Sequence, residues 1–227
     1  MLLHPTLPMA KTIPISVAEN GEPAMSLARR TLLVAALLLP TTAAFAQSAP
    51  IVTRIRGTVV GFADATLTVA TREGPNVSIT LPGTLAPSAL KRMSMTDIKP
   101  NSFIATVAAP DASGTLQASY VMIFPEAMRG TGEGHYDWDL APGTSMTNAT
   151  VASIGSATAG HKLALVYKNT PIEISVPDNT PILSAAPASR DDLRPGVHVF
   201  IVASKADNGS LTANRVYVGK DGVNPPQ

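Results

Sequence analysis

The sequence predicts an all-β protein with two tandem small five-stranded OB-like β-barrels behind an N-terminal signal peptide. Three observations carry this prediction. Apolar and polar residues alternate with a period of two along several short segments, which is typical of half-buried strands. The chain matches itself at an offset of 95 residues, and a secretory leader lies near its start.

The leader occupies residues 25–46. A basic pair, Arg29 and Arg30, is followed by a short apolar run and by a small-residue motif that ends at Ala46. We expect cleavage after Ala46 and a periplasmic or secreted protein, exported by either the Sec or the twin-arginine route. The apolar run is too short to span a bilayer, so no transmembrane segment is expected in the mature chain. Residues 1–24 are interpreted as a non-native upstream extension.

Composition excludes several classes of function. Of 17 basic and 16 acidic residues, the segment 1–46 holds three and two, so the mature chain has 14 of each. A neutral chain without a basic cluster does not predict a nucleic-acid binder. The chain has no cysteine, which excludes disulfides, thiolate metal sites and a cysteine nucleophile.

The self-match organises the rest of the chain. Residues 97–123 align without a gap on 192–218, and 76–82 align on 171–177, with glycines, prolines and apolar positions in agreement. Ancestral duplication of one unit explains this agreement. The predicted divisions are a first β-barrel at 50–126, a Gly/Trp connector strap at 127–147, a second β-barrel at 148–220 and a disordered tail at 221–227.

Each copy contains five predicted strands. They lie at 54–62, 65–71, 76–82, 102–109 and 115–124 in the first copy and at 148–155, 161–167, 171–177, 197–204 and 211–218 in the second. Between the third and fourth strands, helix formers from Ser88 to Met95 predict a short helix in the first copy, and a 3₁₀ turn or coil is expected in the second. Five short strands with this insertion predict an OB-type barrel, and a small sandwich is the alternative.

The paired "D-[IL]-[KR]-P" and "G-x-L-x-A-x-x-V" units flank the segment "MRGTGEGHYDWDLAPGTSMTNATV" at 128–151. In these features the chain resembles an uncharacterised family of exported bacterial proteins, of the domain-of-unknown-function type, with tandem small OB-like β-barrels. The resemblance covers most of the mature chain. It implies a β-barrel fold and a periplasmic or secreted location, and it implies no activity.

The segment "GTGEGHYDWDL" at 130–140 supports two interpretations. The first is a divalent metal site, because carboxylates and an imidazole would project to one side of an extended strand. Its candidate ligands are Glu133, His135, Asp137 and Asp139. However, only two other histidines follow in the mature chain, and no spacing typical of a metal motif is present.

The second interpretation, which the sequence favours, is a structural strap without a cofactor. Its glycines permit tight turns, its aromatic rings fill apolar gaps between the barrels, and Asp137 or Asp139 caps a turn or pairs with Arg129. The residues assigned to this strap are Arg129, Gly130, Gly132, Gly134, Tyr136 and Trp138. No nucleophile has a matching motif, so the sequence predicts no enzyme.

Two arginines on the first predicted strand, Arg54 and Arg56, could contact an anionic partner, but a solvated face is the expected account. His198 is expected to be a packing residue. The sequence thus predicts an exported, non-enzymatic binding or interaction protein of the bacterial cell envelope, acting on a protein or small ligand. A periplasmic metal-binding protein that uses the GEGHYDWD segment is the alternative, and a hydrolase at the inter-barrel cleft is a third hypothesis.

Overall fold

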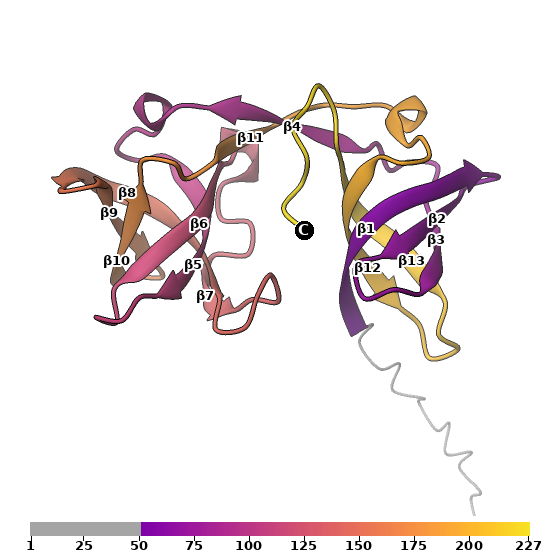
Figure 1. Cartoon of the computed structure of the whole chain (residues 1–227), viewed down its shortest axis with the longest axis horizontal. Coiled ribbons are helices and arrows are strands. Elements are labelled where there is room, and N and C mark those ends of the chain that lie inside the picture. Colours follow the sequence, from indigo (N-terminus) through magenta and orange to yellow (C-terminus); the bar gives the residue numbers. More distant parts are fainter. Residues whose placement is uncertain (1–50) are drawn as a thin grey trace, which may run out of the picture. The chain divides into compact units, whose positions relative to one another are not determined.

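A computed structural model of the chain describes residues 51–227 (Figure 1). The predicted upstream extension, the signal peptide and its cleavage site lie outside these residues. The described part is all-β, with 13 strands and three short 3₁₀ helices. From Ile51 to Gln227, no helix has the length and hydropathy that crossing a membrane requires.

The strands fall into two halves that repeat one order, four strands, a 3₁₀ helix and two strands. A further 3₁₀ helix and a short strand lie between the two repeats. The first half contains β1 (Ile51–Ala63), β2 (Thr66–Thr71), β3 (Asn76–Thr80), β4 (Ser88–Met93), η1 (Met95–Asp97), β5 (Phe103–Pro110), β6 (Leu116–Ile123) and η2 (Glu126–Met128). The second half contains β7 (Gly134–Asp137), β8 (Ser145–Ala157), β9 (Gly160–Tyr167), β10 (Thr170–Pro177), β11 (Ile182–Pro187), η3 (Arg190–Asp192), β12 (His198–Lys205) and β13 (Leu211–Val218).

One barrel is the ring β1-β2-β3-β13-β12. β1 pairs antiparallel with both β2 and β12, and the ring closes where β3 runs parallel to β13. Figure 1 shows β12 and β13 beside β1, although more than 130 residues separate Ala63 from His198 along the chain. The core of this barrel consists of alternate apolar residues, among them Leu67, Val69, Ile79, Leu81, Val199 and Ile201.

The other barrel is the ring β8-β9-β10-β6-β5. β8 pairs antiparallel with β9 and β5, and the ring closes through a parallel contact between Ser175 of β10 and Gln117 of β6. Its fully buried core includes Ile104, Val121, Leu163, Leu165 and Ile174. Each barrel therefore has its own hydrophobic core.

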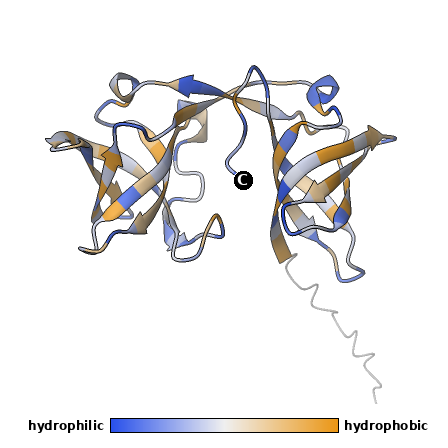
Figure 2. Cartoon of the chain, viewed as in Figure 1, coloured by the Kyte–Doolittle hydropathy of each residue, from blue (hydrophilic) through white to orange (hydrophobic). Residues whose placement is uncertain are grey.

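The alternation of apolar and polar residues is confirmed as a burial pattern. In the segment around β3, Ile79 and Leu81 are fully buried, whereas Ser78 and Thr80 are exposed. Figure 2 shows the same contrast at larger scale: hydrophobic colour lies mainly on the strands, and the turns that carry η1 and η3 are mostly hydrophilic. Burying one face of each strand is what stabilises such small barrels.

The strand pairing differs from the expectation of one contiguous barrel at 50–126 and another at 148–220. Each ring combines three consecutive strands of one half, β1–β3 or β8–β10, with the last two strands of the other half. The exchange follows from β4 and β11, which run between the barrels and pair antiparallel along their whole length. Leu90 of β4 lies opposite Ala185 of β11, its equivalent at the 95-residue offset, so the crossing is symmetrical.

The short helix predicted from Ser88 to Met95 is wrong, because this segment forms β4 and only Met95–Asp97 is helical. In the second half the expected 3₁₀ turn is present as η3, but the extended β11 precedes it. Helix propensity here is a weak preference, and six residue pairs between β4 and β11 outweigh it. β4 also runs parallel to the end of β13, and β11 to the end of β6.

Candidate functional site: an aromatic cavity beside the strap

The central segment begins as an additional strand of the second barrel. β7 pairs antiparallel with β8, so that His135 lies opposite Thr147 and Tyr136 opposite Met146. Two glycines before it have backbone angles that other residues rarely adopt, with φ of 80° at Gly130 and 61° at Gly132. These glycines let the chain turn sharply into β7.

The other end of the segment is fixed to the first barrel. Asp139 Oδ1 lies 2.9 Å from Arg56 Nη2 of β1. Arg72, which follows β2, donates hydrogen bonds to the carbonyl oxygens of Asp139 and Leu140 at 2.5 and 3.0 Å. The segment thus connects β8 of one barrel with β1 and β2 of the other.

Trp138 lies between these attachments, with charged and aromatic groups around its ring. The Arg54 guanidinium carbon lies 4.0 Å from the ring centroid, a distance typical of a cation–π contact. Phe200 of β12 lies 6.3 Å from Trp138, centroid to centroid, and stacks almost parallel on Tyr217 of β13. Arg56 lies over the Phe200 ring at 4.7 Å.

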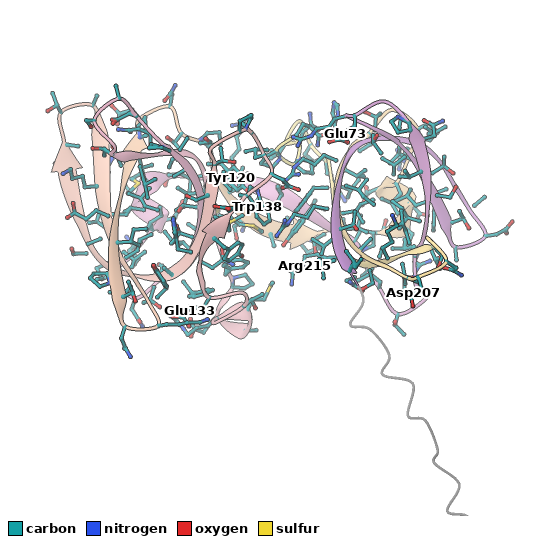
Figure 3. All side chains as sticks on the ribbon, turned by 90° about the horizontal axis from the view of Figure 1, so that it is seen from below. Glu73, Tyr120, Glu133, Trp138, Asp207 and Arg215 are labelled. Atoms are coloured by element: carbon teal, nitrogen blue, oxygen red, sulfur yellow. The ribbon has the colours of Figure 1, made fainter. Side chains whose placement is uncertain are left out.

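These groups form part of the wall of a cavity of about 220 Å³. Six of the ten Phe, Tyr and Trp residues of the chain line it: Tyr120, Phe124, Tyr136, Trp138, Phe200 and Tyr217. Arg54 and Arg215 are the charged residues of the lining, and no carboxylate belongs to it. Tyr120, Trp138 and Arg215 are labelled in Figure 3. The cavity is therefore mainly apolar and aromatic. Arg54 is already paired, since its Nη1 lies 4.0 Å from Asp139 Oδ2, a carboxylate outside the lining.

Two polar atoms of the lining residues are buried without a hydrogen-bond partner in the described structure. They are Trp138 Nε1, a donor, and Asn148 Oδ1, an acceptor. Asn148 is only 6 % exposed, and its amide nitrogen donates to the carbonyl oxygens of Thr131 and Gly132, both at 3.1 Å. These bonds fix the amide so that Oδ1 is the atom left unpaired. Unpaired buried polar atoms are costly, and a bound ligand can supply the missing partners.

The tyrosines of the lining stay protonated at neutral pH. Burial raises the pKa of Tyr120, Tyr136 and Tyr217, because the phenolate loses solvation in an apolar wall. Each neutral hydroxyl can donate a hydrogen bond as well as accept one. The lining thus offers several donors that carry no negative charge.

The C-terminal residues lie against the same cavity. Residues 221–227 were expected to form a disordered tail, but Lys220 and Val223 pair through their backbones, and Pro225 is buried. Pro225 and Pro226 belong to the cavity lining. Figure 1 shows this yellow segment turning back from the end of β13. Because proline has a restricted backbone in the unfolded chain as well, ordering it costs little entropy.

The four candidate metal ligands are not brought together. Glu133 accepts the backbone N–H of Lys168 at 2.9 Å, and His135 Nδ1 lies 2.8 Å from Thr147 Oγ1. Asp137 is exposed, and Asp139 pairs with Arg56. Within residues 51–227, no three His, Cys, Asp or Glu side chains lie close enough to hold a metal ion. The hypothesis assumed that all four residues lie on one extended strand. However, β7 ends at Asp137 and includes only His135 and Asp137.

Two expectations for arginine side chains are wrong: one ion pair and one solvated face. Arg129 pairs with Glu126 rather than with Asp137 or Asp139, and it also donates to the carbonyl oxygen of Asn101. This pairing holds the pKa of Glu126 below its ordinary value, through the hydrogen bond from Arg129. Arg56 is 3 % exposed and does not lie on a solvated face, because Trp138 and Asp139 reach across to it.

Sequence reasoning missed the cavity as a site. Tyr120, Phe200 and Tyr217 come from β6, β12 and β13, which no local motif connects. The available signal was compositional. Only 4 % of the residues are aromatic, and two of those in the lining, Phe124 and Tyr217, lie near the ends of predicted strands. His198 was expected to pack, and it lies in β12 with Nδ1 at 3.4 Å from Thr58 Oγ1.

Comparisons of the chain with protein-family models, with curated proteins and with solved structures find no match.

Proposed function

We propose that this chain is an exported, non-enzymatic binding protein of the bacterial cell envelope, and that its ligand occupies the aromatic cavity. One observation carries the proposal: most of the chain's few aromatic residues line a single cavity, together with two arginines and no carboxylate. Apolar clefts with a few convergent polar groups are the usual form of ligand sites.

The lining defines the chemistry of the ligand. Aromatic rings favour a flat or apolar body, and Arg54 and Arg215 favour a group that carries negative charge or carbonyl oxygens. Trp138 Nε1 and Asn148 Oδ1 are buried beside the cavity without hydrogen-bond partners in the described structure. Among the described residues that line the cavity there is no carboxylate to bind a cationic ligand, and Asp139 beside Arg54 is already paired with arginines.

We further infer that the two barrels are OB-like units that arose by duplication. When β4 and β11 are left out of the count, the strand order in each ring is first-second-third-fifth-fourth, with the third and fifth parallel. The equivalent elements, including η1 and η3 with matching serine–aspartate capping boxes, support the duplication. Export and the resemblance to the bacterial family rest on the sequence of the leader and of residues 128–151.

No observation favours the alternative functions. The carboxylates and imidazole of a metal site lie apart, and in the described part of the chain no hydrogen bond joins His135 to a carboxylate as a hydrolase would require. His135 is also absent from the cavity lining. The binding function is therefore the one that the geometry supports.

The single tryptophan makes the proposal testable. In the mature chain, Trp138 contributes the only indole N–H resonance, so a ¹H–¹⁵N spectrum reports directly on the cavity. We expect 2-naphthoate to shift this resonance saturably, and 2-naphthalenemethanol, which lacks the charge, to bind more weakly. Loss of one guanidinium contact in Arg54→Met should weaken 2-naphthoate binding by about fivefold or more.

Arg194→Met serves as the matched control, because Arg194 is exposed and hydrogen-bonds only to the nearby carbonyl of Asp191. Its affinity for 2-naphthoate should equal that of the parent chain. An indole resonance that stays unchanged with both naphthalene probes at millimolar concentration would remove the cavity as a ligand site.

A further inference from the structure

We propose that the physiological occupant of the aromatic cavity is an extended, proline-rich segment of another protein, which takes the place of the chain's own Pro225 and Pro226. This inference rests on the proposed function, because it names the ligand class of the same cavity. It goes beyond that function by committing to a polypeptide partner instead of a small molecule.

The first support is the residue pair already present at the wall. Pro225 is buried and Pro226 half-buried, and both belong to the lining of the cavity, as do Tyr217 and Trp138. The remaining space of about 220 Å³ shows that the tail does not fill the site. The tail thus shows that the cavity wall can pack against proline residues. A longer proline-rich segment would fill more of the cavity.

The second support is the shape and chemistry of the lining. Polyproline II segments bind in grooves lined by aromatic residues, because flat rings pack against pyrrolidine rings and the ligand loses little entropy. Here the rings of Phe200 and Tyr217 stack within 5° of parallel, and Trp138 lies edge-on to Phe200. Tyr120 and Tyr136 extend the same aromatic wall.

The third support is the balance of donors and acceptors. A proline residue has a carbonyl oxygen but no N–H, so a proline-rich segment offers acceptors and few donors. The lining contains donors: the guanidinium groups of Arg54 and Arg215, and the hydroxyls of its tyrosines.

The test uses the whole mature chain and capped hexaproline, with a capped Gly-Ser hexapeptide of equal length as the control ligand. Isothermal titration calorimetry measures affinity, and the Trp138 indole resonance shows whether the peptide occupies the cavity. We expect hexaproline to bind there and the Gly-Ser peptide not to bind. The double variant Pro225→Ser with Pro226→Ser should bind hexaproline about tenfold more tightly, because the tail no longer competes for the site.

Two single variants complete the design. Trp138→Phe keeps an aromatic ring but reduces the ring surface at the cavity wall, and should weaken binding by about fivefold. Asp221→Asn alters an exposed tail residue outside the cavity and should leave the affinity unchanged. Circular dichroism checks that every variant keeps the β-rich spectrum of the parent chain.

The outcomes separate the two proposals. If 2-naphthoate shifts the Trp138 resonance and hexaproline does not, the partner class is wrong and the binding function stands. If neither ligand shifts it, both proposals fail. A lower affinity of the double variant for hexaproline would also overturn the inference, because the tail would then assist the ligand instead of competing with it.

Discussion

Arg56 Nη2 lies 2.9 Å from Asp139 Oδ1, although Arg56 belongs to β1 of one barrel and Asp139 follows β7 on the other. This contact between two side chains joins the strap to β1. Asp139 retains 45 % exposure of its side chain, whereas Arg56 is buried. The contact therefore neutralises a buried cation from its solvent side.

Removing this carboxylate should destabilise the fold. Asp139→Ala leaves the Arg56 guanidinium buried without its counter-ion, and its Nε atom is already unpaired. A fully buried pair would cost more, but the exposure of Asp139 reduces the expected loss to about 2 kcal/mol in urea unfolding. As a control, Glu173→Gln removes an exposed carboxylate 3.9 Å from Lys162 and should change stability by less than about 0.5 kcal/mol. Equal effects of the two substitutions would contradict this account.

The exchanged strand pairing can be tested by cross-linking, because the chain has no cysteine of its own. Val52 of β1 lies opposite Ser204 of β12, within the separation that a disulfide requires. The paired substitutions Val52→Cys and Ser204→Cys should form a disulfide under mild oxidation, visible as a shift on a non-reducing gel.

The matched control uses the equivalent position in the first half, which is Ala109 at the 95-residue offset. In a contiguous barrel, Val52 would lie opposite Ala109 instead of Ser204. We therefore expect no intramolecular disulfide from Val52→Cys with Ala109→Cys. The reverse result would show that each half forms its own barrel.

A close backbone approach at Gly57 should make this position intolerant of any side chain. A Cβ atom there would lie 2.1 Å from the carbonyl oxygen of Ala70 in β2, so the two strands would have to separate. We expect Gly57→Ala to lower the free energy of unfolding by about 3 kcal/mol. Gly61→Ala on the same strand is the control, since no atom lies within 4 Å of its Cβ position. Comparable losses for both would show that strand propensity, not the close approach, is responsible.

The contribution of Asp111 to the stability of the turn between β5 and β6 should persist below the ordinary pKa of an aspartate. Hydrogen bonds from Ser113 and then Gln117 lower the pKa of Asp111 from 3.8 to about 2. A group with a depressed folded-state pKa stabilises the fold above its unfolded pKa and loses that contribution as pH falls through the folded value. The stabilisation by Asp111 should therefore disappear between about pH 4 and pH 2.

Carboxyl NMR titration measures this directly. Ser113→Ala should raise the Asp111 midpoint, whereas the midpoint of Asp97, whose pKa is lowered by Ser94, should not move. A midpoint of Asp111 that is the same with and without the Ser113 hydroxyl would show that this hydrogen bond does not lower the pKa.

The sequence by itself determined the class of fold and the position of most strands. Period-two alternation is a local property, so residues such as Ile79 and Leu81 could be assigned to a core without knowledge of their partners. The 95-residue repeat likewise predicted two barrels with equivalent elements. The strap was predicted from its glycines and its tryptophan. In the structure β7 pairs with β8, and Asp139 lies beside Arg56 of β1.

Only the tertiary structure decided which strands share a barrel and where the cavity lies. Because the two halves are alike, β5 and β12 fit the same place beside β1 or β8, and local patterns are the same for contiguous and exchanged pairing. The choice depends on whether Ser88–Met93 extends to pair with Ile182–Pro187. That pairing joins residues almost a hundred positions apart, and it brings Trp138, Phe200 and Tyr217 around one space.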